Sequence, residues 1–256
     1  MITSKTNPQV KNIVKLRNAK ERKEQNKIII EGYREISRAV TCGFQIDTLY
    51  ICPEIADKGK DIPSKNVEEV SLDVFDKIAY REGSDGLLAL AVPKYAELNS
   101  FKPGKDPLII VLETVEKPGN LGAVMRTADA AGVDAVIIAD PRTDIFNPNA
   151  IRASIGCIFS VPLFACTSEK CIQWLRQNNI RIYCTYLKAS IDYLEADFRK
   201  GSAIVMGTEA TGISDIWVQE ADQNIIIPMN GIADSLNVSV TTAIVTFEAV
   251  RQRRTR

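Results

Sequence analysis

Continuous apolar runs that alternate with helical patterns constrain the fold of this chain more than any other feature of its sequence. Residues 108–112 are Leu, Ile, Ile, Val and Leu, a run that is typical of a strand covered on both faces. We predict strands at 108–112, 135–139, 161–166, 180–185 and 204–206, helices at 121–131 and 168–178, and a short helix followed by a turn at 149–159. Such alternation predicts a parallel sheet with helices on both faces.

The first part of the chain shows a similar mixture on a smaller scale. We predict a basic helix at 7–26, further helices at 33–41 and 72–79, and strands at 27–31, 48–52, 67–70 and 86–92. Residues 96–107 combine prolines, a glycine and charged residues with little periodicity, which indicates a linker. The sequence therefore predicts a smaller α/β domain at 1–95, a linker at 96–107 and a larger α/β domain at 108–256.

Three loops of the larger domain follow predicted strands, at the sheet edge where parallel sheets bind their ligands. They are residues 113–120, 207–214 and 228–237. In the second loop, Glu209 stands between Gly207 and Gly212, and these glycines let the backbone approach a ligand. A tight turn capped by the glutamate would show the same pattern. The third loop follows a predicted buried strand that begins at Ile225. The chain bends at Pro228 and Gly231 before a long amphipathic segment, and we expect a ligand to bind in that bend.

The residue types that are missing restrict the chemistry. Histidine is absent, which removes the commonest general base and the commonest zinc ligand, and we expect no metal site. No Gly-x-Gly-x-x-Gly or Walker pattern occurs, so a dinucleotide or P-loop nucleotide site is not expected. No apolar run could span a membrane or direct export, and the six cysteines include no Cys-x-x-Cys pair. We therefore expect a cytoplasmic protein whose thiols are reduced and structural.

The charge of the chain is balanced overall but unevenly distributed. The formal net charge is zero, yet residues 1–27 hold eight lysines and arginines against two glutamates, and further arginines follow 250. Basic clusters suit a polyanion, because phosphates are contacted by lysine and arginine. A solvated helix face and a frayed tail would show the same composition, so charge alone leaves both interpretations open.

Three motifs in the larger domain resemble those of one family. Residues 118–128, Pro-Gly-Asn-Leu-Gly-Ala-Val-Met-Arg-Thr-Ala, resemble the first motif of the SpoU (TrmH-type) RNA ribose 2′-O-methyltransferases. Residues 206–214 and 227–240 resemble their second and third motifs, in the same order. Residues 30–32 and 86–89 are more loosely similar to the RNA-binding N-terminal domain of this family. Alanine at 210 replaces a glycine that is usual there, and aspartate at 234 stands where glutamate is frequent.

The resemblance implies properties that the strand and helix pattern does not give. It implies a trefoil-knotted α/β domain of the SPOUT superfamily with a parallel sheet, preceded by a smaller α/β RNA-binding domain like ribosomal protein L30e. It also implies S-adenosylmethionine as cofactor, structured RNA as substrate and a homodimer formed through the knotted domain. The pattern alone predicts an open doubly wound sheet, because threaded chains are nearly absent among folds.

The same resemblance assigns roles to individual residues. The expected catalytic residues are Asn120, Arg126, Glu209, Ser235 and Asn237. The expected contacts to S-adenosylmethionine are Gly207, Glu209, Ile227, Met229 and Leu236. The expected contacts to RNA are Lys11, Arg17, Arg126, Arg152 and Ser154. Helix or loop capping would equally explain Glu209, Ser235 and Asn237, and capping does not exclude function.

The role of Arg126 in the reaction needs a physical argument. In this family the arginine is often assigned as the general base, but a guanidinium holds its proton too tightly for that task. We favour the hypothesis that Arg126 fixes the adjacent phosphate and stabilises the developing alkoxide, while the proton leaves to water or a carboxylate. A sulfonium methyl is already activated, so alignment and removal of the hydroxyl proton suffice.

Two other classes of function remain open at this point. A non-catalytic RNA-binding protein could retain the fold, although the joint presence of the five expected catalytic residues counts against it. An unrelated enzyme acting on a small nucleotide would have no use for the basic N-terminus. For the substrate, we favour rRNA over tRNA because a separate N-terminal α/β domain is more typical of the family's rRNA enzymes.

Overall fold

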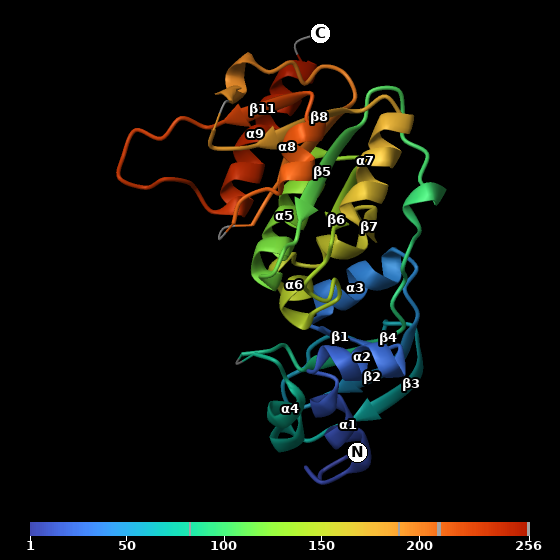
Figure 1. Ribbon diagram of the computed structural model, residues 1–256. Coiled ribbons are helices and arrows are strands. Elements are labelled where there is room, and N and C mark those ends of the chain that lie inside the picture. Colours follow the sequence, from blue (N-terminus) through green and yellow to red (C-terminus); the bar gives the residue numbers. More distant parts are fainter. Residues whose placement is uncertain (82, 189, 209–210, 255–256) are drawn as a thin grey trace. The chain divides into compact units, whose positions relative to one another are not determined.

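The computed structural model describes residues 1–81, 83–188, 190–208 and 211–254, and it contains two compact units (Figure 1). The first unit is Met1–Lys94 with Asp144–Ser160, and the second is Tyr95–Thr143 with Val161–Arg256. The expected linker at 96–107 thus belongs to the second unit, and residues 144–160, which the sequence placed in the larger domain, pack within the first. The functions expected of the two domains remain predictions.

The described part of the second unit contains a seven-stranded sheet, and all its strand pairs are parallel. The strand order is β7-β6-β5-β10-β8-β11-β9. The strands are β5 (Leu108–Glu113), β6 (Ala135–Ala139), β7 (Leu163–Cys166), β8 (Arg181–Thr185), β9 (Ile191–Asp192), β10 (Ser202–Met206) and β11 (Gln223–Ile226). The predicted parallel sheet is confirmed, and β9 is a short strand that the sequence did not predict.

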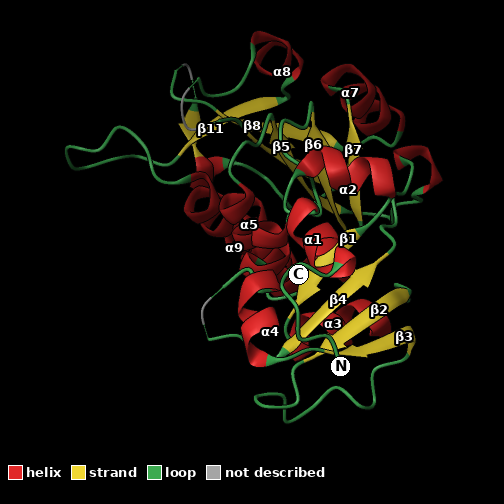
Figure 2. Ribbon diagram, turned by 90° about the horizontal axis from the view of Figure 1, so that it is seen from below, coloured by secondary structure: helices red, strands yellow, loops and turns green. Residues whose placement is uncertain are grey.

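Helices cover both faces of this sheet (Figure 2). Helix α7 (Ser168–Gln177) packs against α8 (Asp215–Glu220), and α5 (Pro118–Ala131) packs against α9 (Val238–Arg254). Figure 2 shows the first pair on one face and the second pair on the other. Trp174 and Trp217 fill the space between α7, α8 and the alternate strand residues Ile109 and Val111. The predicted layers are therefore confirmed.

Short 3-10 turns lie in the same unit at Leu98–Ser100 and Tyr193–Glu195.

The first unit has a smaller sheet with mixed strand directions. Its strand order is β1-β4-β2-β3, in which β4 is antiparallel to β1 and β2, and β2 is parallel to β3. The strands are β1 (Ile28–Glu31), β2 (Ile46–Ile51), β3 (Ser64–Glu69) and β4 (Leu87–Ala91). The helices are α1 (Pro8–Lys15), α2 (Ala19–Gln25), α3 (Tyr33–Thr41), α4 (Leu72–Ile78) and α6 (Pro148–Ala153), and a 3-10 turn lies at Cys157–Phe159.

The single basic helix expected at 7–26 is wrong, because the chain forms two helices there. Helix α1 ends at Lys15, and the side chain of Asn18 accepts a hydrogen bond from the backbone N–H of Lys20 as the N-cap of α2. Asparagine is favoured at such positions because it satisfies an amide that no helical carbonyl reaches. A continuous helix would leave this cap unused.

Two arginines hold residues 144–160 in the first unit. The guanidinium of Arg22 is almost fully buried, lies 2.6 Å from the carboxylate of Asp144, and also donates to the carbonyl of Leu16. Arg38 donates from Nη1 to the carbonyl of Ile155 at 2.6 Å. A buried arginine needs such partners to offset its desolvation. The basic residue Arg22 therefore belongs to the interior of the unit, not to a solvated face.

The last helix is anchored by Arg253, which the sequence suggested as part of a basic tail. Its guanidinium donates to the carbonyls of Asp106, Pro107, Phe198 and Lys200. We expect Arg253→Ala to lower the free energy of unfolding by about 2–3 kcal/mol, because several carbonyls lose a charged donor. Urea denaturation measures this change. Arg254→Ala, at an exposed position, is the matched control and should change the value by less than about 0.5 kcal/mol; equal effects would contradict the anchoring role.

None of the helices within the described ranges combines the length and apolar character that crossing a membrane would require.

Candidate functional site

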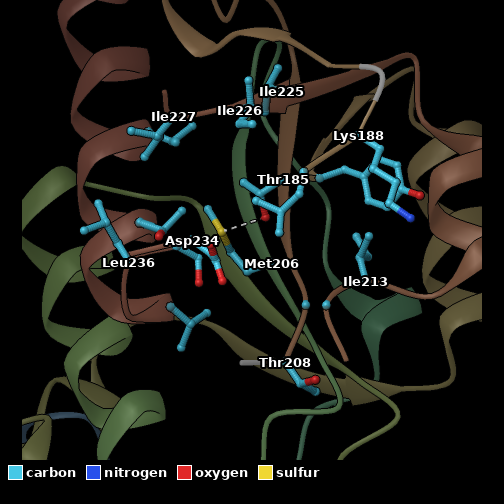
Figure 3. Close-up of a pocket in the computed structure, with 18 of the residues that line it drawn as sticks. Thr185, Lys188, Met206, Thr208, Ile213, Ile225, Ile226, Ile227, Asp234 and Leu236 are labelled. Atoms are coloured by element: carbon cyan, nitrogen blue, oxygen red, sulfur yellow. Dashed lines mark hydrogen bonds between the residues drawn. The ribbon is translucent and has the colours of Figure 1, made fainter. Parts of the chain in front are cut away.

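A pocket of about 480 Å³ opens at the carboxyl ends of β8, β10 and β11 (Figure 3). Four of the five expected cofactor contacts line it: Gly207, Ile227, Met229 and Leu236. The fifth, Glu209, lies outside the described residues. Residues that follow two different strands, 206–208 with 211–213 after β10 and 225–238 after β11, thus contribute to one cavity, as the sheet-edge argument predicted. The bend after β11 leaves the body of the unit as a long loop (Figure 1).

The lining combines an apolar floor with charged groups at the rim. Met206 lies at the centre of the view in Figure 3, and the hydroxyl of Thr185 contacts its sulfur at 3.4 Å. The side chains of Ile213 and Ile225 are buried beside it. The charged lining residues Lys188, Asp215 and Asp234 are exposed and form no ion pair with other described residues. The pocket therefore suits a ligand with an apolar body and charges of both signs.

The turn after β10 is held by contacts within itself. The backbone N–H of Thr208 donates to the carbonyl of Gly212 at 2.9 Å, and the N–H of Gly212 donates back to the carbonyl of Thr208 at 3.0 Å. A side chain on Gly207 would collide with the backbone of Gly212 and Ile213. Only glycine therefore permits this closed pairing of Thr208 with Gly212. We define the described residues around it, 207–208 and 211–214, as the motif-two loop.

A second, smaller pocket of about 80 Å³ adjoins the first and shares Met206, Gly207, Thr208 and Val238 with it. The expected catalytic residue Asn120, in the first turn of α5, lines this smaller pocket. Its Oδ1 accepts a hydrogen bond from Nδ2 of Asn237 at 3.3 Å. The structure thus brings together side chains of the first and third motifs, which are separated by more than a hundred residues in the sequence.

Asn237 also caps the last helix, so the capping and functional interpretations coexist there. Its Oδ1 accepts from the backbone N–H of Ser239 at 2.9 Å and from the hydroxyl of Ser239 at 2.6 Å, at the start of α9. Ser235 lines the larger pocket, is exposed, and forms no hydrogen bond with other described residues. Among the described residues, Asn237 and not Ser235 caps α9, so the capping role that the sequence allowed for Ser235 is wrong.

Arg126 lies on α5, six residues beyond Asn120. Its side chain is exposed, and the guanidinium forms neither a hydrogen bond nor an ion pair with other described residues. An exposed guanidinium that pairs with none of the described residues can bind an anion. The structure places it on the same helix as Asn120 but outside the residues that line the two pockets.

The remaining expected RNA contacts belong to the first unit. Lys11 on α1 and Arg152 on α6 are exposed and form no ion pair with other described residues. Arg17 donates to the carbonyls of Lys77 and Ala79, at 3.1 and 2.7 Å, which satisfies the end of α4. Arg17 therefore has a local structural role, although its side chain stays exposed.

Ser154 does not fit the contact expected of it. Its side chain is fully buried, its hydroxyl donates to the carbonyl of Ile151 at 2.8 Å, and it accepts from the backbone N–H of Ile158 at 3.4 Å. Both hydrogen-bonding capacities are used in closing the turn after α6. A direct contact with RNA would require that turn to open.

Several lining residues were not predicted from the sequence. Thr185 is the last residue of β8, residues 186–188 follow it, and Tyr193 follows the short strand β9. This region shows no clear periodicity, yet its position just after a predicted buried strand was a usable signal. Glu113, at the carboxyl end of β5, lines the smaller pocket. It is the first residue of the predicted loop 113–120, but no role was assigned to it.

The buried thiol of Cys184, one residue before the lining residue Thr185, is a poor nucleophile. Burial raises the pKa of Cys184, and the nearby carboxyl groups of Glu113 and Asp222 raise it further. The protonated thiol donates to the carbonyl of Trp217 at 3.4 Å. The six cysteines, all within the described residues, form no disulfide bond. Across the described ranges, no cluster of three or more His, Cys, Asp or Glu side chains gathers as metal ligands would.

Comparison with known proteins places these features in a family. The model of the SpoU rRNA methylase family matches residues 107–247, and that of the MRM3-like substrate binding domain matches residues 7–89. The chain is 28% identical over 246 residues to the 23S rRNA (guanosine(2553)-2′-O)-methyltransferase RlmP of Bacillus subtilis. The matched region covers 96% of this chain and 97% of that protein.

Two solved structures are similar over almost the whole chain. One is an RNA 2′-O ribose methyltransferase, with a TM-score of 0.89, 38% identity and coverage of 99% of both chains. The other is an AdoMet-bound rRNA methyltransferase from Sinorhizobium meliloti, with a TM-score of 0.89, 33% identity and coverage of 98% of this chain and 97% of that one. As its three motifs predicted, the chain belongs to the SpoU rRNA methylase family, a family of RNA methyltransferases.

Proposed function

We propose that the protein transfers a methyl group from S-adenosylmethionine to a ribose 2′-hydroxyl of rRNA. The observation that carries this proposal is the convergence of three motifs on two adjoining pockets: the larger holds the expected donor contacts, and the smaller holds Asn120 with Asn237 beside it. The relative from Bacillus subtilis is named as a 23S rRNA 2′-O-methyltransferase, and the structure from Sinorhizobium meliloti was determined with AdoMet bound.

The larger pocket fits the donor in size and in chemistry. Its volume of about 480 Å³ falls within the roughly 300–1,000 Å³ of typical cofactor sites. Its apolar floor suits the adenine ring, and the exposed charges of Lys188, Asp215 and Asp234 suit a ligand that carries an ammonium, a carboxylate and a sulfonium. When bound, S-adenosylmethionine supplies a methyl group already activated for transfer.

The protein's own residues then have to align the acceptor and manage charge. In our proposal Asn120 and Asn237 orient the ribose, Ser235 and Glu209 complete the polar surface, and Arg126 holds the adjacent phosphate. The same guanidinium stabilises the negative charge that develops on the ribose oxygen as the proton leaves. The exposed cations Lys11 and Arg152 of the first unit add sequence-independent attraction to the RNA backbone.

We further propose a cytoplasmic homodimer with a trefoil knot in the second unit. These properties follow from the resemblance to the SPOUT superfamily. The exposed apolar side chains of Val240 and Phe247 on α9, 46% and 45% exposed, suit a partner surface better than water. We favour rRNA over tRNA for two reasons. The N-terminal residues match a substrate binding domain, and the relative from Bacillus subtilis is named as an rRNA enzyme.

Donor binding is tested most directly without RNA. We expect S-adenosylmethionine to bind saturably in isothermal titration calorimetry, and Leu236→Asp to weaken it at least about tenfold, because a carboxylate would enter the apolar part of the pocket. Ile232→Asp is the matched control, since Ile232 lies in the same loop, is fully exposed and lines neither pocket. Absence of binding to the unaltered protein would contradict the proposed cofactor.

The acceptor is tested by mapping 2′-O-methyl groups in rRNA and tRNA from a strain that lacks the protein. We expect one or a few rRNA positions to lose the modification and to regain it when the gene is restored. Loss in tRNA alone would contradict the rRNA assignment, and loss in neither would contradict methyl transfer.

A further inference from the structure

A buried carboxyl group holds the end of the motif-two loop, and no motif resemblance assigned it a role. Glu113 is the last residue of β5, and its side chain is only 4% exposed. Its Oε2 accepts a hydrogen bond from the backbone N–H of Ser214 at 2.9 Å, and its Oε1 accepts from the hydroxyl of Ser214 at 2.5 Å. Among the described residues, no lysine or arginine forms an ion pair with it.

The location of Ser214 makes this contact consequential. Ser214 ends the motif-two loop and is the N-cap residue of α8, but its hydroxyl is turned to Glu113 and does not cap the helix. The other end of the loop leaves β10, the strand that pairs with β5 in parallel register. The loop therefore begins after β10, and its last residue, Ser214, is hydrogen-bonded to Glu113 on the neighbouring strand β5.

The loop that Glu113 holds forms part of both pockets. Gly207, Thr208, Gly212 and Ile213 line the larger pocket, and the first two also line the smaller. Glu113 itself lines only the smaller one. Any effect of Glu113 on a ligand of the larger pocket must then be transmitted through the loop.

We infer that Glu113 is a positioning residue that sets the conformation of the motif-two loop, and through it the affinity of the larger pocket for the methyl donor. The inference rests on the proposed function in that S-adenosylmethionine is the ligand. A carboxyl group that accepts two hydrogen bonds from one residue fixes that residue more firmly than a single hydrogen bond would, because both bonds must break before the residue can move. The contact also satisfies an amide at the start of α8 that no helical carbonyl reaches.

The test compares three variants with the unaltered protein. Glu113→Ala should raise the dissociation constant for S-adenosylmethionine about tenfold in calorimetry, since the loop loses two hydrogen bonds. Glu113→Gln should restore much of the affinity, because the amide oxygen still accepts from the Ser214 N–H and the amide NH₂ can donate to the hydroxyl. Ser214→Ala should weaken binding about twofold to fivefold, by loss of one of the two contacts.

A double variant and a second readout separate positioning from other roles. Glu113→Ala combined with Ser214→Ala should bind the donor within about twofold of Glu113→Ala alone, because the shared contact is already absent. Without donor, amide hydrogen exchange at Thr208 and Gly212 should become about tenfold faster in Glu113→Ala, since the loop opens more often. Glu169→Gln, an exposed carboxylate on α7 that lines neither pocket, should change neither quantity.

Each outcome decides the inference. Unchanged donor affinity in a folded Glu113→Ala protein, or independent effects of the two substitutions, would overturn it. A fall in kcat of Glu113→Gln with unaltered donor affinity would instead place Glu113 in direct contact with the acceptor. If the unaltered protein binds no S-adenosylmethionine, the proposed cofactor fails, but the exchange rates at Thr208 and Gly212 still decide whether Glu113 holds the loop.

Discussion

Arg126→Ala is expected to lower kcat for RNA methylation by about 10²–10³-fold, the usual effect of removing a donor that stabilises developing negative charge. The guanidinium is exposed on α5 and satisfies no other described group, so its loss should leave the fold intact. The residue lines neither pocket, and the affinity for S-adenosylmethionine should stay within about twofold. Single-turnover methylation and calorimetry on the same preparations measure the two quantities.

Arg126→Lys distinguishes how the arginine acts. Lysine keeps the positive charge but lacks the planar fork that holds a phosphate through two hydrogen bonds. We expect kcat intermediate between those of the unaltered protein and Arg126→Ala if charge on the phosphate and alkoxide is the main contribution. Unchanged turnover of Arg126→Lys and of Arg126→Ala, with normal donor binding, would remove Arg126 from the mechanism.

Strand and helix periodicity predicted the second unit well because its elements are long and buried. The run at 108–112 became β5, and the helix expected at 121–131 became α5, which ends at Gly132 in the left-handed conformation. The short strand β9 was missed because two residues, Ile191 and Asp192, carry no detectable alternation. The helix expected at 7–26 was too long because its pattern was interpreted without the cap at Asn18.

Domain membership could not be predicted from chain order. Residues 144–160 lie between β6 and β7 in the sequence, so continuity suggested the larger domain. In the structure, Asp144 pairs with the buried Arg22, and Ile155 accepts from Arg38, so the segment packs in the first unit. These partners are more than a hundred residues apart, and no local pattern reports such a pairing.

The site residues that belong to sequence motifs could be predicted. The residues that reach the site only because folding brings distant parts of the chain together could not. Gly207, Ile227, Met229 and Leu236 were named from motifs, and they line one pocket. Lys188 was not named and Glu113 was given no role, because their significance depends on the neighbours that the folded sheet brings to them. Ser154 was named on resemblance, but its buried hydroxyl is used within its own turn.

Gly207→Ala should weaken binding of S-adenosylmethionine by about tenfold to a hundredfold, which corresponds to the roughly 1–3 kcal/mol cost of overpacking a filled site. The added methyl group would overlap the backbone of Gly212 and Ile213, which cannot rotate away as a side chain can. The paired hydrogen bonds between Thr208 and Gly212 must then open, and the wall shared by both pockets must move.

The matched control for this substitution is Gly104→Ala in the same unit, where an added methyl group would meet no atom within 4 Å. Calorimetry of both variants separates a local effect on the loop from a general effect of replacing glycine. We expect Gly104→Ala to bind the donor as the unaltered protein does and Gly207→Ala to remain folded, because the turn it disturbs lies at the end of β10 and outside the sheet. Equal donor affinity in both variants would show that the closed turn after β10 does not shape the donor pocket.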